Sequence, residues 1–110
     1  MKVSELAEKL GFEALVTPSP DETVSGGYVG DLLSWVMSRA EAGQVWITIM
    51  TNINIVAVAL LSGVSAIIIA EGCPVPDDVI KKAREEGINI LRSNLSAFAV
   101  SAAVSRALGS

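Results

Sequence analysis

The chain of 110 residues is 51% hydrophobic with a formal net charge of -4, which predicts one domain, residues 1–110, with a sizeable aliphatic core. Its acidic balance, with no run of Lys or Arg, argues against nucleic-acid binding. The single Cys73 excludes an internal disulfide and fits a cytoplasmic protein, and because the chain has no His we expect no metal and no cofactor.

The first third of the chain predicts a helix, a short strand and a turn-rich stretch. Apolar residues at helical spacing run through 3–10, and 14–17 is a short strand ended by prolines. Residues 19–30 are polar and rich in turn residues, although 24–29 could add an edge strand. A helix capped by Asp31 should follow. Its expected inward face is Leu32, Leu33, Val36, Met37 and Ala40.

The uncharged stretch 42–70 predicts a central β-α-β unit. Its two β-branched runs, 45–49 and 64–69, have the composition of strands that are covered on both faces. Asn52 or Asn54 can cap the helix between them. The alternative is a membrane-spanning segment, but polar and small residues interrupt every window of about twenty residues, so we expect no membrane association.

The last third predicts one more helix, a strand and a final helix. A helix starts at Pro76 and ends at Gly87, residues 88–91 are a strand, and the final helix passes through Phe98. Strands that alternate with helices across short loops predict an α/β protein, a layered α/β/α domain with a mostly parallel sheet of four to five strands. The partner of the first strand stays open.

In a mostly parallel sheet, the loops after the strands line one edge, where ligands usually bind. We expect this edge to hold Thr17-Pro18 and the loops at 51–54, 71–73 and 92–94. The candidate ligand-binding residues are Thr51, Asn52, Asn54, Glu71, Arg92, Ser93 and Asn94. Helix N-termini near Asn54 and Asn94 would favour a small polar or anionic ligand there. Alternatively, the Asn, Ser and Thr residues serve only as caps and turns.

A glycine-rich loop precedes the second predicted helix. Its spacing, Gly-Gly-x-x-Gly, is not the dinucleotide fingerprint, and the chain has no Walker motif. We therefore interpret it as a turn or an interface, formed by Gly26, Gly27, Tyr28, Gly30 and Asp31. Trp35 and Trp46 should face the core or an interface. Asp31 and Glu71 are isolated carboxylates, so we name no catalytic residue.

Three segments carry a family resemblance: residues 27–37, residues 43–49 with 54–59, and residues 83–91 with 96–98. Together they resemble the DRTGG domain in its small single-domain form. This implies a layered α/β fold similar to the N-terminal domain of HPr kinase/phosphorylase, without that kinase's P-loop domain. The Asp-Arg-Thr-Gly-Gly string is missing, and residues 70–73 stand where its end is expected. A His that often precedes the Asn of the second segment is also missing, with 51–54 reading Thr-Asn-Ile-Asn.

DRTGG domains accompany CBS domains or a phosphotransacetylase in larger proteins, so the resemblance implies a regulatory, ligand-sensing or dimerising role. We expect a non-catalytic homodimer in the cytoplasm. It would bind a small molecule or nucleotide, or a partner enzyme. The alternative is a phosphate-handling enzyme related to HPr serine kinase, or an accessory subunit of it. That function would need Arg92 as a cationic clamp and Glu71 as a base.

Overall fold

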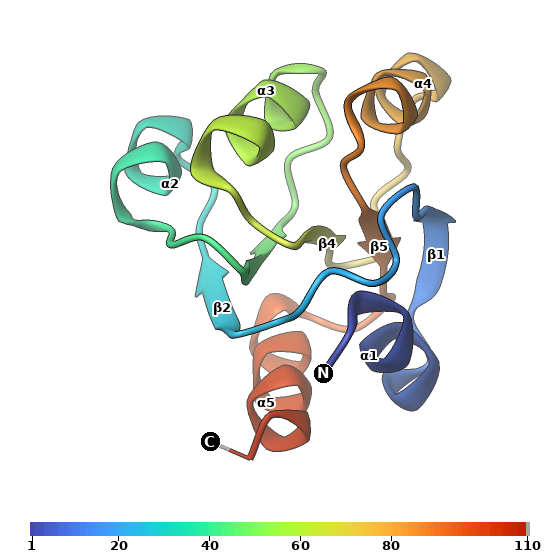
Figure 1. Ribbon diagram of the computed structural model, residues 1–110, viewed down its shortest axis with the longest axis vertical. Coiled ribbons are helices and arrows are strands. Elements are labelled where there is room, and N and C mark those ends of the chain that lie inside the picture. The colour runs from blue at the N-terminus through green and yellow to red at the C-terminus, as the bar shows by residue number, and fades with distance from the viewer. Residues whose placement is uncertain (110) are drawn as a thin grey trace.

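The structure is a computed structural model that describes residues 1–109 (Figure 1). Its strands are β1 (Glu13–Val16), β2 (Gly26–Val29), β3 (Gln44–Thr48), β4 (Ala66–Ile69) and β5 (Ile90–Arg92). Its helices are α1 (Val3–Leu10), α2 (Leu33–Arg39), α3 (Asn54–Ser62), α4 (Asp77–Glu86) and α5 (Ala97–Ala107). The predicted α/β class is confirmed, because helices cover both faces of a mostly parallel sheet of five strands.

The strands lie in the order β1-β5-β4-β3-β2, and every neighbouring pair is parallel except β1 and β5. The edge strand expected within 24–29 is β2, at one end of the sheet. At the other end β1 runs antiparallel to β5, with Glu13 opposite Arg92. The sheet therefore has two edges of different kinds, one antiparallel and one parallel.

The direction of β1 makes one predicted part of the ligand-binding edge wrong. Thr17-Pro18 follows an antiparallel strand and lies at the amino end of the parallel strands. There the Ser19 N–H donates to Oδ1 of Asn89 at 2.9 Å, and Nδ2 of Asn89 donates to the carbonyls of Ser19 at 2.7 Å and Ser65 at 2.9 Å. Glu13, the first residue of β1, lies at the predicted edge instead.

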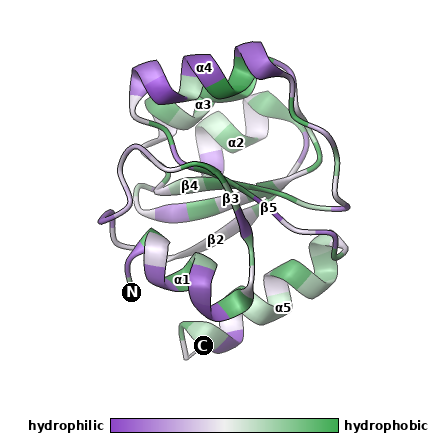
Figure 2. Ribbon diagram, turned by 90° about the vertical axis from the view of Figure 1, so that its right-hand side faces the viewer, coloured by the Kyte–Doolittle hydropathy of each residue, from purple (hydrophilic) through white to green (hydrophobic). Residues whose placement is uncertain are grey.

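Two apolar cores fill the two faces of the sheet (Figure 2). Helices α2, α3 and α4 cover the face that carries Trp46 and Ile67, and helices α1 and α5 cover the face that carries Ile47 and Ile68. Every residue of β4 is fully buried between them. Since full burial of an Ile side chain stabilises the fold by about 1.5–3 kcal/mol, the three isoleucines of β4 contribute substantially to stability.

The membrane alternative for the central stretch does not match the structure. That stretch is divided into β3, α3 and β4, and α3 has only 9 residues. Across residues 1–109, no helix has both the length and the apolar character that a membrane crossing requires.

Only the C-terminal end of the central helix agrees with the prediction. The N-cap of α3 is Ile53, without a side-chain cap bond, so neither Asn52 nor Asn54 is the cap; the Asn54 N–H donates to Oδ1 of Asn52 at 3.0 Å in a turn that leads into the helix. Gly63 ends this helix at φ 73°, in the left-handed region where a side chain would add strain.

The two tryptophans differ in burial. Trp46 is fully buried, as predicted, whereas Trp35 is 50% exposed and the Arg39 guanidinium stacks 3.8 Å from its ring centroid. Leu32 and Met37 are also exposed, so the predicted inward face of α2 is wrong for these two residues. The reason is position, because α2 lies at the end of the sheet, where it has α3 on one side and no helix on the other (Figure 1).

Candidate functional site

The four parallel strands end at one edge of the sheet, which we call the rim. It comprises the segments after β2, β3, β4 and β5, at residues 30–32, 49–53, 70–76 and 93–96. Helices α2 to α5 all begin there, so their unpaired first-turn N–H groups point toward it. Within residues 1–109, no group of three or more His, Cys, Asp or Glu residues could hold a metal ion.

Asp31 joins the end of β2 to the end of β3. Its Oδ1 accepts hydrogen bonds from Thr48 Oγ1 at 2.7 Å and from the Ile49 N–H at 3.0 Å. The N-cap of α2 is Leu32, without a side-chain bond, so the predicted capping role of Asp31 is wrong. Both bonds end on Oδ1, which leaves Oδ2 of this exposed carboxylate available to a ligand.

Thr48 was missed by the sequence analysis, although a signal for it exists. Thr48 carries a hydroxyl at the last position of the apolar strand β3, and the residue is 1% exposed. Its Oγ1 accepts from the Met50 N–H at 3.1 Å while donating to Asp31. Buried hydroxyls must find such partners, so a lone Thr in a buried strand indicates a local polar network.

The turn after β4 carries backbone strain. Glu71 at φ 61° and Gly72 at φ 63° are both left-handed, and the Cys73 N–H donates to the carbonyl of Ala70 at 3.4 Å. Within residues 1–109, Glu71 is the only residue other than glycine with a positive φ. This conformation costs about 1–2 kcal/mol for a residue with a side chain.

The same turn is bonded to the segment after β5. The Glu71 N–H donates to the Leu95 carbonyl and the Gly72 N–H to the Ser93 carbonyl, both at 2.8 Å. A Cβ on Gly72 would lie 2.5 Å from Oδ1 of the exposed Asn94, which would have to move, and the φ of 63° would strain any side chain there. The candidates Glu71, Ser93 and Asn94 are therefore brought together.

Arg92 is already paired. Its Nε and Nη2 donate to Oε1 of Glu13 at 3.1 and 2.9 Å, and its Nη1 donates to the Cys73 carbonyl at 3.4 Å. The charge of Arg92, the predicted cationic clamp, is thus balanced by Glu13. Glu13 could not be predicted as its partner because the place of Glu13 depends on the direction of β1.

The capping alternative explains several of the candidates. Oδ1 of Asn52 accepts from the Asn54 N–H in the turn before α3, and Oγ of the buried Ser93 accepts from the Leu95 N–H at 3.1 Å. The cap of α5 is Ser96, whose Oγ accepts from the Ala99 N–H, so Asn94 does not cap this helix. Thr51 and Asn54, together with Asn52, form a separate group at the start of α3.

A family model of the DRTGG domain matches residues 5–107. The chain belongs to the DRTGG domain family. A search of the curated proteins found no match for this DRTGG domain. The similarity to HPr kinase/phosphorylase stays a prediction.

The solved structures include a similar one: the CBS and DRTGG domains of the regulatory region of Clostridium perfringens pyrophosphatase, complexed with its activator, diadenosine tetraphosphate. The two chains share 18% identity with a TM-score of 0.70, over 93% of this chain and 45% of that one. At this identity the likeness shows the fold alone. This DRTGG domain spans less than half of the length of that regulatory region.

The charges around the rim of this DRTGG domain are mostly negative. Carboxylates of Glu13, Asp31 and Glu71 lie there, and Asp77 and Asp78 start α4 beside them. The one rim cation identified above, Arg92, is engaged by Glu13. This balance disfavours an anion and favours a ligand that offers hydrogen-bond donors.

The predicted glycine loop is a strand of this DRTGG domain. Gly26, Gly27 and Tyr28 belong to β2, and Tyr28 packs against the core beneath α2 to α4, so the interpretation as a turn is wrong. Only Gly30 and Asp31 lie at the rim. Gly30 is held there because its carbonyl accepts from Nε1 of Trp46 at 2.9 Å.

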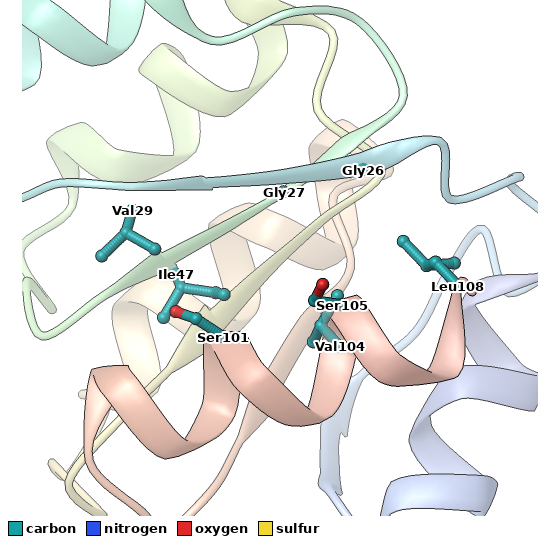
Figure 3. A pocket seen from close by; sticks show the side chains of 8 residues that line it. All are labelled: Gly26, Gly27, Val29, Ile47, Ser101, Val104, Ser105 and Leu108. Atoms are coloured by element: carbon teal, nitrogen blue, oxygen red, sulfur yellow. The ribbon is translucent and has the colours of Figure 1, made fainter. Parts of the chain in front are cut away.

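A hollow of about 290 Å³ lies between β2 and α5, and we call it the β2–α5 hollow (Figure 3). Its main lining residues are Gly26, Gly27, Val29, Ile47, Val104 and Leu108. Five surface hollows of about 290 to 370 Å³ were located, and Asn52, Glu71 and Asn94 line none of these five. These three rim residues therefore lie apart from the β2–α5 hollow.

Proposed function

We propose that this DRTGG domain is a regulatory module that senses a small polar metabolite at the rim, without doing chemistry on it. The observation that carries the proposal is Glu71. Its carboxylate makes no hydrogen bond or ion pair within residues 1–109, yet its backbone is held in a costly conformation on an exposed turn. A glycine would relieve the strain, so the side chain has a use that the folded domain alone does not supply.

The chemistry of the rim defines the ligand class. The Glu71 carboxylate and Oδ2 of Asp31 are acceptors, and the exposed amides of Asn54 and Asn94 can donate or accept. A ligand with amino or hydroxyl groups satisfies these acceptors, whereas a phosphate would meet repulsion from both carboxylates. The proposed ligand is therefore a neutral or cationic polar metabolite, and a nucleotide would bind through its base and ribose.

A regulatory role also requires something to regulate. The regulatory region of the Clostridium perfringens pyrophosphatase is named with its activator, which supports a sensing role for similar domains. Beside the rim, Leu95 is 50% exposed and Phe98 is 84% exposed at the start of α5. Exposed apolar side chains next to a ligand surface suit contact with a partner enzyme, so the proposal includes such a partner and a homodimeric state.

Thermal unfolding of the full chain tests the ligand class with three probes: adenosine, spermidine and diadenosine tetraphosphate. A ligand at 100 times its dissociation constant adds about 2.7 kcal/mol of stability, which raises Tm by several degrees in a domain of this size. We expect adenosine or spermidine to raise Tm, and Glu71→Gly or Asp31→Asn to remove most of that shift.

Glu85→Gln is the matched control, because it changes an exposed carboxylate on α4 away from the rim. It should leave the ligand shift unchanged. A shift seen only with diadenosine tetraphosphate, a shift that survives Glu71→Gly, or no shift with any probe would contradict the proposed site.

The phosphate-handling alternative has no comparable support. It needs Arg92 to act with Glu71, and the Arg92 guanidinium instead donates to Glu13 and to the Cys73 carbonyl. ATP turnover that is lost in Arg92→Ala and Glu71→Ala would revive it.

A further inference from the structure

The two edges of the sheet differ in how they resist pairing with another strand. β1 has an irregularity in its register between Ala14 and Val16, an acid at Glu13 and a proline at position 18, three features that block edge-to-edge contact. The β2 edge, residues 25–30, carries no charge and no proline. An unprotected edge strand is a template for a further strand.

Alternation along β2 identifies the backbone groups that point outward. The Gly30 N–H donates to the Ile47 carbonyl on β3 at 3.2 Å, and Tyr28 is paired with Trp46. Because successive residues of a strand direct their N–H and C=O groups to opposite sides, Gly27 and Val29 present theirs away from β3. Their side-chain positions face α5, since both residues line the β2–α5 hollow (Figure 3).

We propose that β2 pairs antiparallel with β2 of a second copy of this chain, about a two-fold axis at Tyr28. This deepens the homodimer of the proposed function. The axis sets Gly27 of each copy opposite Val29 of the other, and each such pair exchanges both of its N–H···O bonds. Tyr28 of one chain lies opposite Tyr28 of the other, and the backbone N–H and C=O groups of each Tyr28 point toward β3 of its own chain.

The side chains favour this register over its neighbours. Opposed residues in an antiparallel pair share one face, so Val29 of each copy lies over Gly27 of the other, on the α5 side. Val29 is 49% exposed, and the β2–α5 hollow beside Gly26 and Gly27 has room for its methyl groups. An axis at Gly27 would set Val29 opposite Ser25, and an axis at Val29 would set Val29 opposite Val29 of the other copy. In either register Val29 would not lie over Gly27, and the β2–α5 hollow would stay unfilled.

Charge and exposed apolar side chains support a second copy as the occupant. The chain has a net charge of -4, yet the seam brings no acid against an acid, because this register sets Asp31 opposite the Ser25 hydroxyl. On the other face, Trp35 and Met37 on α2 and Leu32 just before it are exposed at the same end of the sheet (Figure 1). A stable dimer buries about 800 Å² per partner, and these apolar side chains extend the contact beyond the two paired strands.

Sedimentation of the full chain tests the pairing with matched variants. Gly27→Val fills the hollow that Val29 of the other copy should enter, and Val29→Lys puts a charge on the seam. A Cβ on Gly27 would meet its nearest atom, Val45 Cγ2, at 3.6 Å, which is ordinary van der Waals contact. Each variant should raise the dimer dissociation constant at least about tenfold. Leu61→Lys, at a 72% exposed position on α3, should not.

The double variant Gly27→Val with Val29→Gly exchanges the small and large partners across the axis and should restore dimerisation. In a Cys73→Ser background, Tyr28→Cys should form a disulfide-linked dimer on mild oxidation, because opposed residues without mutual backbone bonds have Cα atoms about 4.5 Å apart. Circular dichroism of each variant reports whether it is folded.

The outcomes separate this proposal from the one before it. A dimer that is unaffected by Gly27→Val and Val29→Lys, and that is not linked through Tyr28→Cys, overturns the β2 pairing and leaves the homodimer standing. A wild-type chain that is monomeric at micromolar concentration overturns both, while ligand sensing at the rim is still judged by thermal unfolding.

Discussion

The two ends of the parallel strands both carry polar networks, and they differ in where those networks point. At the amino end, Asn89 is fully buried and its amide satisfies backbone groups of Ser19 and Ser65. At the rim, Asp31 and Glu71 have exposed carboxylates with oxygens that accept no hydrogen bond within residues 1–109, and the backbone of Glu71 is left-handed. The inward network holds the fold, whereas the outward network leaves acceptor oxygens exposed to solvent.

The largest expected effect is at the amino end. Asn89→Ala removes three hydrogen bonds from a buried site and leaves backbone groups unsatisfied, so it should lower the free energy of unfolding by about 3 kcal/mol. Urea unfolding measures this. Asn54→Ala, an exposed change at the rim, should stay within about 0.5 kcal/mol. Equal losses for the two would contradict the comparison.

Arg92 tests whether a rim residue can be structural. Arg92→Ala loses its bonds to Glu13 and to the Cys73 carbonyl and should lower the free energy of unfolding by about 1–2 kcal/mol. Because Glu13 is mostly exposed, a double-mutant cycle with Glu13→Gln should give a coupling below about 1 kcal/mol. The ligand-induced shift in Tm should survive Arg92→Ala, and its loss would return Arg92 to the binding site.

Glu71→Gly sharpens the comparison because stability and binding should change in opposite directions. Relief of the left-handed strain stabilises the folded state by about 1–2 kcal/mol. Glycine also raises the conformational entropy of the unfolded chain, which offsets part of this, so the free energy of unfolding should rise by about 0.5–1 kcal/mol. Urea unfolding should show this increase while the ligand shift falls. The same change at Glu85, inside α4, should instead destabilise by about 1 kcal/mol.

The smallest effect concerns Glu22, at the amino end beside Ser19 and Gly87. Burial raises the pKa of its carboxyl, so the folded state favours the protonated form and loses this stability as the pH rises through that pKa. Glu22→Gln should therefore stabilise at pH 7 by less than about 0.5 kcal/mol, since the group is mostly exposed. Thermal unfolding should show the gain shrink in acid, and a gain that grows there would contradict the assignment.

Most helices and strands could be predicted from the sequence alone. The uncharged stretch 42–70 indicated two buried strands around a helix, and it forms β3, α3 and β4, with Gly63 at the end of the helix. Hydrophobic periodicity and caps are local signals, so they can be read from neighbouring residues alone. The sequence also predicted that Glu71, Ser93 and Asn94 lie together, because the loops that follow parallel strands lie at one edge of the sheet.

The order of the strands and their directions could be read only from the folded domain. β1 could pair either way from its sequence, and its antiparallel choice moved Thr17-Pro18 off the rim and brought Glu13 to Arg92. The exposure of Trp35 likewise depends on α2 lying at the end of the sheet. Strand order and direction arise from contacts between residues far apart in the chain, and no local pattern encodes those contacts.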